Sequence, residues 1–171
     1  MTSATTPVWA IAPQPADSPE AAALLREYLT DVADRWHLRE DGRPCTPQEI
    51  AGYLAETTDD DITPPRGVLL VGRDGGGEPG GCVGVRRLDA RTAELTRMFV
   101  RPGHRGRGGA PALLAAAEAA ARAWGAGRMV LETRLDLTEA RALYARHGYA
   151  AIAPYCEGPY TEVWLGKELS R

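Results

Sequence analysis

One short stretch constrains the fold of this chain more than any other. Four glycines and three arginines, within residues 101–109, separate a strand-like run over residues 93–100 from a helix-like run over residues 111–124. Glycine lets the backbone turn sharply and approach a ligand closely. The helix that follows would aim its free N–H groups and the positive end of its dipole at the turn. The stretch therefore predicts an anion site that is suited to phosphate.

Two common phosphate motifs do not fit this turn. A P-loop ends in Gly-Lys-Ser/Thr, whereas this turn ends in Gly109-Ala110-Pro111. The dinucleotide fingerprint needs another glycine spacing and an early βαβ unit, but here antiparallel strands come first. An RNA-binding Arg/Gly turn is a third possibility. The net charge of −3, the pI near 5.7 and the single phenylalanine argue against it, so we expect no nucleic-acid partner.

Length and composition favour a single globular domain over residues 1–171, with residues 1–6 disordered. No apolar run approaches the ~20 residues that cross a membrane, and the first residues do not resemble a secretory signal. Three widely spaced cysteines suggest neither a disulfide framework nor a metal site, which favours the reducing cytoplasm and no metal cofactor. The arginine- and alanine-rich composition, with Lys167 as the single lysine, is typical of a GC-rich bacterial genome.

Capping signals and hydrophobic periodicity predict the order of the elements. Ser18-Pro19 starts an amphipathic helix that runs to about Trp36, Thr46-Pro47-Gln48-Glu49 is a capping box that opens a second helix, and Thr138 caps the last helix, which continues to His147. Strands are predicted over residues 8–12, 67–71, 81–88, 92–100, 128–134, 150–153 and 161–165.

The connections between these elements predict how the strands pair. Short turns link the three strands between residues 67 and 100, which favours an antiparallel meander. A helical crossover leads to the strand over residues 128–134, which should therefore lie parallel to the strand over residues 92–100. We expect an α+β protein of three layers, with a mixed, largely antiparallel sheet of six to seven strands and helices on both faces.

Four segments, in the right order, resemble the GCN5-related N-acetyltransferase (GNAT) superfamily. They are the strand over residues 93–102, the turn Arg105–Ala110, which fits Arg/Gln-x-x-Gly-x-Gly/Ala, the strand over residues 129–133, and residues 140–149, which are similar to A-x-x-L-Y-x-x-x-G-F/Y. The resemblance covers residues 67–169 and extends loosely to the two N-terminal helices. It implies a splayed central pair of parallel strands and an acetyl-CoA-dependent N-acetyltransferase that acts on a primary amine.

The resemblance also implies where acetyl-CoA binds. Backbone groups of Met98, Phe99 and Val100 would pair with the pantetheine arm like an added strand. The amides expected to hold the pyrophosphate are those of Gly106, Arg107, Gly108, Gly109 and Ala110. The side chains of Arg105 and Arg107 could add positive charge to this site, or simply be solvated. The chain departs from the family pattern in two places. Pro111 offers no N–H to the cofactor, and Leu137 stands where an asparagine is common.

Three residues are candidates for acid–base catalysis under this resemblance. Tyr144 would protonate the leaving thiolate, although a tyrosine at this place can also simply fill the core. Glu94 and Glu132 occupy positions of the base in two branches of the family. We favour Glu94, because the acceptor should approach from the side that its strand borders. Either glutamate could instead pair with a nearby arginine, such as Arg97 or Arg134, and a water chain could replace both.

Two questions of function stay open in the sequence. An acyl-CoA-binding regulatory module without turnover is the alternative to an enzyme. The acceptor is a small-molecule or peptide amine, and no motif identifies it. Between residues 17 and 62 twelve acidic residues face four arginines, which suggests a cationic acceptor. A homodimer is compatible with the sequence, and no membrane partner is expected.

Overall fold

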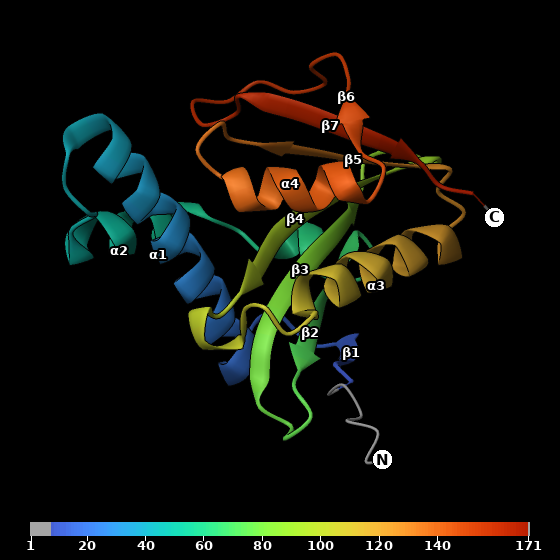
Figure 1. Cartoon of the computed structure of the whole chain (residues 1–171), viewed down its shortest axis with the longest axis horizontal. Coiled ribbons are helices and arrows are strands. Elements are labelled where there is room, and N and C mark those ends of the chain that lie inside the picture. Colours follow the sequence, from blue (N-terminus) through green and yellow to red (C-terminus); the bar gives the residue numbers. More distant parts are fainter. Residues whose placement is uncertain (1–7, 171) are drawn as a thin grey trace, which may run out of the picture.

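The computed structural model describes residues 8–170, so the expected disorder of residues 1–6 lies outside the described part (Figure 1). Seven strands form one mixed sheet in the order β1-β2-β3-β4-β5-β7-β6. The strands are β1 (Ala10–Pro13), β2 (Gly67–Arg73), β3 (Pro79–Arg87), β4 (Thr92–Val100), β5 (Arg128–Thr133), β6 (Ala150–Ala151) and β7 (Val163–Glu168). The helices are α1 (Pro19–Asp41), α2 (Pro47–Glu56), α3 (Gly109–Ala123) and α4 (Thr138–Arg146), with short 3-10 turns η1 (Asp60–Ile62) and η2 (Pro102–His104).

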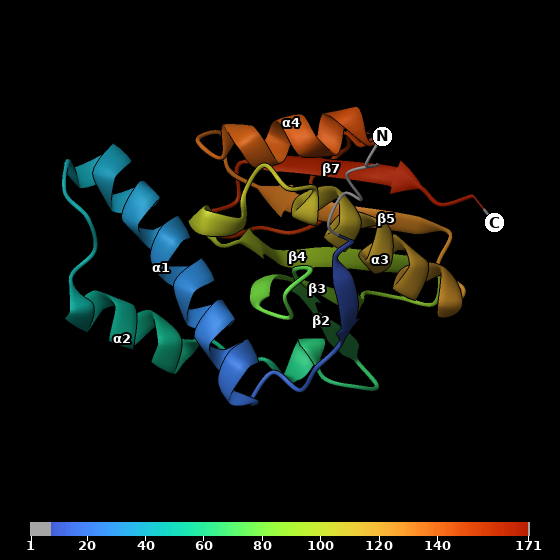
Figure 2. The same cartoon turned by 60° about the horizontal axis from the view of Figure 1, so that its bottom comes forward.

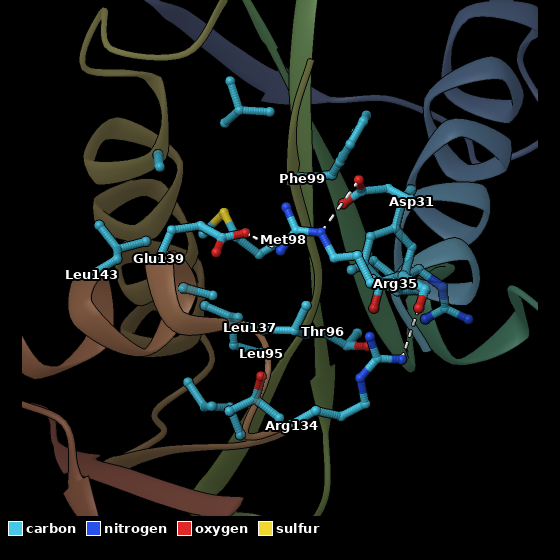
Figure 3. Close-up of a pocket in the computed structure, with 18 of the residues that line it drawn as sticks. Asp31, Arg35, Leu95, Thr96, Met98, Phe99, Arg134, Leu137, Glu139 and Leu143 are labelled. Carbon is cyan, nitrogen blue, oxygen red and sulfur yellow. Dashed lines mark hydrogen bonds and ion pairs between the residues drawn. The ribbon is translucent and has the colours of Figure 1, made fainter. Parts of the chain in front are cut away.

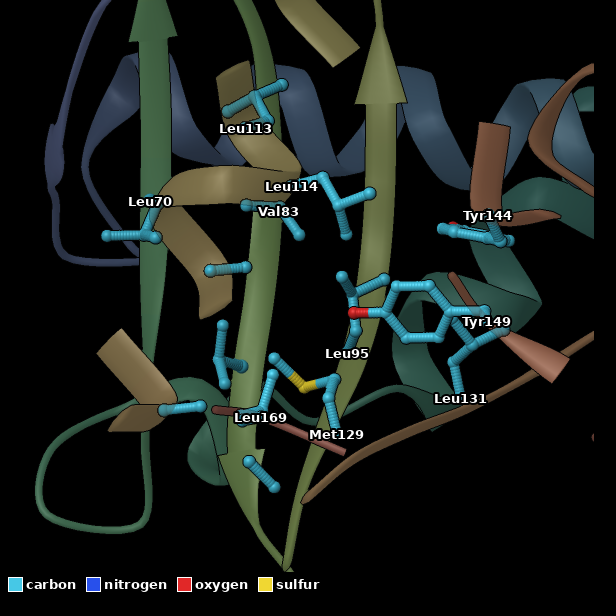
Figure 4. Close-up of a cluster of buried hydrophobic side chains, with 14 of the residues drawn as sticks. Leu70, Val83, Leu95, Leu113, Leu114, Met129, Leu131, Tyr144, Tyr149 and Leu169 are labelled. Carbon is cyan, nitrogen blue, oxygen red and sulfur yellow. The ribbon is translucent and has the colours of Figure 1, made fainter. Parts of the chain in front are cut away.

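The helices cover both faces of the sheet, as Figure 2 shows. On one face α3 and α4 bury a cluster that includes Leu113, Leu131 and Tyr149, and Figure 4 shows this core. On the other face α1 buries Leu24 against Leu69 of β2 and their neighbours. The expected α+β architecture of three layers, with helices on both sides of a mostly antiparallel sheet, is confirmed.

The helix starts follow the capping signals of the sequence, with one exception. The Ser18 hydroxyl accepts a hydrogen bond from the Ala21 N–H at 3.3 Å, and Thr46 accepts one from the Glu49 N–H at 3.1 Å. The predicted start of the second helix is therefore confirmed, and the Glu49 carboxylate reaches back to the Thr46 hydroxyl, which donates to it at 3.1 Å. The prediction for Thr138 is wrong. Leu137 occupies the cap position of α4, and no side chain caps that helix.

Most predicted boundaries shift by one or two residues, and three elements differ in a way that changes their extent or place in the sheet. Helix α1 continues to Asp41, five residues beyond Trp36, because no stop signal precedes Gly42, which takes the left-handed conformation at φ 70°. Strand β6 has only two residues, and the chain then leaves the sheet. Strand β7 begins at Val163 and fills the place between β5 and β6, antiparallel to both.

Candidate active site

The parallel strands β4 and β5 pair only at their beginnings and then separate. Their register ends at the pair Glu94–Val130, although β4 continues to Val100 and β5 to Thr133. A cavity of about 810 Å³ lies along this divergence, lined by α1, α2, β4, β5, α4 and the turn after β4. The predicted splay of the central parallel pair is present, and Figure 3 looks into the cavity along β4.

An irregularity in β4 turns its backbone as it enters the cavity. The register with β3 shifts between Cys82 and Gly84, and opposite this shift Arg97 takes a positive φ of 51°. Such bulges bend a strand and redirect its side chains. Arg97 lines the cavity, and its guanidinium donates to the carbonyl of Thr58 at 2.8 Å and lies 3.4 Å from Asp59.

Backbone groups beyond the bulge alternate between β3 and the cavity. The Phe99 carbonyl faces β3, since a Cβ built on Gly81 would lie 2.5 Å from it, and the Arg101 N–H donates to Gly80. Alternation along a strand then turns the polar groups of Met98 and Val100 toward the cavity. The Val100 carbonyl already accepts a hydrogen bond from Arg105 Nε at 2.9 Å. Of the three residues predicted to pair with pantetheine, Met98 and Val100 thus turn backbone groups toward the cavity. Phe99 lines the cavity too, but its backbone carbonyl faces β3.

The glycine-rich turn directs the start of α3 at the same cavity. Gly106 and Gly108 have φ values of 75° and 81°, which explains glycine at both positions. Gly108 is the cap residue of α3 and brings no side chain to the first free amides. The cavity is lined by Arg105, Gly106, Gly108, Gly109 and Ala110 of the predicted set. Arg107 does not line it. Free amides at a helix start are suited to an anion.

Tyr144 projects from α4 into the inner end of the cavity, and its ring is only 4% exposed. It packs edge to face on Tyr149, with ring centroids 5.7 Å apart, which Figure 4 shows. No residue of the described chain makes a hydrogen bond to its hydroxyl. Burial raises the pKa of Tyr144, so the phenol keeps its proton at neutral pH. Tyr28 of α1 is a second phenol in the cavity, with a pKa raised by burial to about 12, and sequence reasoning missed it.

Glu94 is buried in a hydrogen-bonded network at the floor of the cavity. Its Oε1 accepts from Arg86 Nε and its Oε2 from the Tyr155 hydroxyl, each at 2.6 Å. Arg86 also donates to Asp61 at 3.0 Å. The alternative that Glu94 pairs with a nearby arginine is confirmed, but the arginine is Arg86 and not one of the two named as examples. Arg97 turns to Thr58, and Arg134 donates to Asp136 and to the carbonyl of Val32.

Glu132 lies on β5 in the same cavity and differs from Glu94 in its partners. No salt bridge within residues 8–170 involves it. Its side chain is open to the cavity, yet the surrounding protein desolvates it. Desolvation raises the pKa of Glu132, with a further contribution from the charge of Glu94 and an opposing hydrogen bond from Thr161. A carboxylate with a raised pKa and no cationic partner is suited to accept a proton.

An ion pair that the sequence did not predict crosses the opening of the cavity. Arg35 reaches from α1 to Glu139 on α4, above Met98 of β4, as Figure 3 shows. Arg35 also lies 3.6 Å from Asp31, one helical turn earlier. Arg35 and Glu139 are 104 positions apart in the sequence, so no local sequence signal could connect them. The pair ties the wall made by α1 to the wall made by α4.

A second feature missed in the sequence lies beneath the glycine-rich turn. Trp9, which precedes β1, is buried, and its Nε1 donates to the Arg107 carbonyl at 3.0 Å. The indole ring also meets His104 edge to face, with centroids 6.1 Å apart. His104 in turn contacts Asp74 at 3.1 Å. The turn is therefore supported from below by a residue almost one hundred positions away.

One cluster of possible metal ligands lies at the junction of α1 and α2. Ligand atoms of His37, Cys45 and Glu49 lie within 4.8 Å of one another. All three groups have protein partners: His37 contacts Asp41 at 2.7 Å and Tyr53 at 2.9 Å, and Cys45 points at Glu49. Hydrogen bonds account for this arrangement. The expectation that the protein works without a metal stays a prediction.

Comparison with known proteins places this arrangement in a family. The profile of the Acetyltransferase (GNAT) family matches residues 17–149. The chain belongs to the GNAT family. An uncharacterized N-acetyltransferase of Schizosaccharomyces pombe is 30% identical over 159 residues, which cover 92% of this chain and 91% of that protein. Family membership makes the chain an acyltransferase, and the resemblance seen in the four sequence segments is confirmed.

Solved structures agree with this assignment. A crystal structure from Klebsiella pneumoniae, described as that of an acyl-CoA N-acyltransferase, is 28% identical in sequence and has a TM-score of 0.67. The alignment covers 95% of this chain and 98% of the Klebsiella chain. A GNAT family acetyltransferase of Elizabethkingia anophelis, solved with acetyl-CoA bound, has a TM-score of 0.60 at 20% identity and aligns over 94% and 98%. The second comparison supports the GNAT fold. None of the helices within residues 8–170 has the length and apolarity that a membrane crossing requires.

Proposed function

We propose that this GNAT protein transfers an acetyl group from acetyl-CoA to a primary amine by direct attack of the amine on the thioester. One observation carries the proposal: the start of α3, the separated strands and Tyr144 all border one cavity. An extended donor with an anionic end and a reactive end matches these features in that order. The acetyl-CoA bound to the Elizabethkingia protein supports the choice of donor.

The donor would lie along β4. The amides of Gly108, Gly109 and Ala110 would hold the pyrophosphate, because they are the first free N–H groups of α3. The backbone of Met98 and Val100 would pair with the pantetheine arm, after the Arg105 side chain leaves the Val100 carbonyl. Arg105 is exposed, so its release into water and toward the phosphates costs little.

Tyr144 is the proposed general acid. The amine nitrogen forms a bond to the thioester carbon, and the bond between that carbon and sulfur breaks. The Tyr144 hydroxyl then donates its proton to the departing sulfur. Burial keeps this phenol protonated until the thiolate forms, and its hydroxyl has no competing acceptor among residues 8–170.

Glu132 is the proposed general base, in preference to Glu94. An ammonium acceptor must lose one proton before it attacks, and the reacting nitrogen loses another as the amide forms. Glu132 can take such a proton directly or through a water. Both oxygens of Glu94 are engaged by Arg86 and Tyr155, so its proposed role is to hold this network and to raise the pKa of Glu132 by its charge.

The acceptor is a small-molecule or peptide amine that enters from the side of α1 and α2. The acidic residues that suggested a cationic acceptor are largely paired, among them Asp31 with Arg35, Asp59 with Arg97 and Asp61 with Arg86. Ion pairs weaken the field at the cavity. We therefore propose a requirement for one reactive amine and for no second positive charge. A flat dependence of kcat/KM on ionic strength would agree with this.

The proposed setting of the enzyme is the cytoplasm. Cys45, Cys82 and Cys156 are all free thiols, which fits a reducing compartment. The bacterial origin and the homodimer suggested by the sequence stay predictions, as does the single domain over residues 1–171.

The experiment that tests this function follows the free thiol of CoA. The protein is incubated with acetyl-CoA and a panel of small amines and peptides, and the products are identified by mass. Thiol release that depends on an amine, with one acetyl group on that amine, is the expected result. Binding of acetyl-CoA without release in any mixture would favour the regulatory module instead.

A further inference from the structure

Trp9 lies in the one place where β2, β3 and the start of α3 meet. Its ring is 9% exposed. It does not line the cavity, but its Nε1 donates a hydrogen bond of 3.0 Å to the Arg107 carbonyl, in the turn whose amides face the cavity. A residue that contacts the turn but does not line the cavity is placed to position the turn.

Three glycines from three different elements make room for this one ring. A Cβ built on Gly72 of β2 would lie 3.0 Å from the indole. On Gly80 of β3 and on Gly109 of α3 the distance would be 2.5 Å. Real side chains essentially never approach so closely, so a larger residue at Gly80 or Gly109 would displace the ring. The indole therefore sets how closely the turn approaches the sheet.

The hydrogen bond of Trp9 also sets the direction of an amide. In a trans peptide the C=O of one residue and the N–H of the next point in opposite directions. The Arg107 carbonyl points at Trp9, so the Gly108 N–H points away from Trp9, on the side of the cavity that Gly108 lines. Rotation of this one peptide would remove the amide from the cavity.

We infer that Trp9 fixes the anion-binding turn and thereby sets the affinity for the pyrophosphate of the acyl donor, without touching the donor. This inference rests on the proposed function, because it assumes a donor of the CoA type. It extends the binding site to a residue that precedes the first strand. It also explains why Gly72, Gly80 and Gly109 stand where they do, a pattern that the spacing of the phosphate motif alone does not account for.

The decisive variant is Trp9→Phe, which keeps an aromatic ring and removes the N–H donor. Its matched control is Trp124→Phe, at the far end of α3, where Arg87 covers the ring at 4.6 Å. Each variant is assayed with two donors: acetyl-CoA, and the acetyl thioester of pantetheine, which lacks the pyrophosphate. Loss of one hydrogen bond predicts a KM for acetyl-CoA about 3–10-fold higher in Trp9→Phe, with kcat unchanged. With acetylated pantetheine, kcat/KM should equal that of the wild type.

Two results would overturn the inference. If kcat/KM of Trp9→Phe falls equally with both donors, Trp9 only stabilises the fold. If kcat/KM falls with neither donor, the turn holds its conformation without Trp9. Should Trp9→Phe fail to fold, Gly109→Ala is the second variant, since its Cβ would push the indole aside, and Gly103→Ala, with open space around it, is the control. The affinity for CoA itself is measured by calorimetry. A wild type that binds CoA but acetylates no amine would contradict the proposed function and leave the role of Trp9 measurable.

Discussion

Arg86 and Glu94 lie directly opposite each other on β3 and β4, and the Arg86 guanidinium donates to the Glu94 carboxylate at 2.6 Å. Directly opposed side chains on neighbouring strands are the closest pairs that a sheet provides. This pair occupies one oxygen of Glu94, and Tyr155 occupies the other. The two glutamates that resemble catalytic bases are therefore chemically unequal, which permits a direct test.

Glu132→Gln and Glu94→Gln should separate the base from its neighbour. The pKa of Glu132 is raised, so the acidic limb of the wild-type profile of kcat/KM against pH should lie above the ordinary carboxyl value of about 4.3. We expect Glu132→Gln to lower kcat/KM at neutral pH by about 10²-fold and to remove that limb. Glu94→Gln should keep a limb, displaced to lower pH because one neighbouring negative charge is gone. A limb that survives in Glu132→Gln and vanishes in Glu94→Gln would reverse the assignment.

The raised pKa of Glu132 also predicts an effect on stability. Between the unfolded and folded pKa values the folded chain holds a proton that the unfolded chain has lost, so stability falls as the pH rises through this interval. Glutamine carries no charge and escapes this penalty. Glu132→Gln should therefore have a higher Tm than the wild type at neutral pH, and the two values should converge below about pH 4. Equal Tm values at both pH values would show that Glu132 is not desolvated.

Features built from neighbouring residues could be predicted from the sequence, whereas contacts between distant segments could not. The turn at residues 105–110 was predicted because strand, glycines and helix follow one another directly. Arg86 was not named as the partner of Glu94, although the short turn between Leu88 and Thr92 sets the register that places the two residues opposite each other. Trp9 was missed because the glycines around it lie on three elements that only the folded sheet brings together.

Gly108→Ala should weaken both the fold and cofactor binding. Gly108 has φ 81°, a conformation that costs an L-residue about 1–2 kcal/mol, while nothing within 4 Å would obstruct the added methyl group. We expect a lower Tm and a smaller rise of Tm with acetyl-CoA, since a ligand that binds the native state stabilises it. Gly103→Ala, also in open space but without a positive φ, is the control and should match the wild type. Gly108→Glu adds a negative charge to the same strain and should abolish the rise. If acetyl-CoA raises the Tm of Gly108→Glu as much as that of Gly108→Ala, no anion binds at this turn.

Tyr144→Phe is the sharpest test of the proposed chemistry. The change removes one hydroxyl, which makes no hydrogen bond within residues 8–170, and it keeps the ring against Tyr149. Stability should therefore be nearly unchanged. If the hydroxyl protonates the leaving thiolate, kcat should fall by about 10²-fold, the lower end of the usual contribution of a general acid. The lower end is expected because a thiol with a pKa of about 8.5 leaves fairly well unaided. The affinity for acetyl-CoA, measured by calorimetry, should stay within about twofold. Tyr28→Phe is the matched control, since it removes another buried phenol of the cavity. A loss of rate in Tyr28→Phe, with Tyr144→Phe at the wild-type rate, would assign the acid to α1 instead of α4.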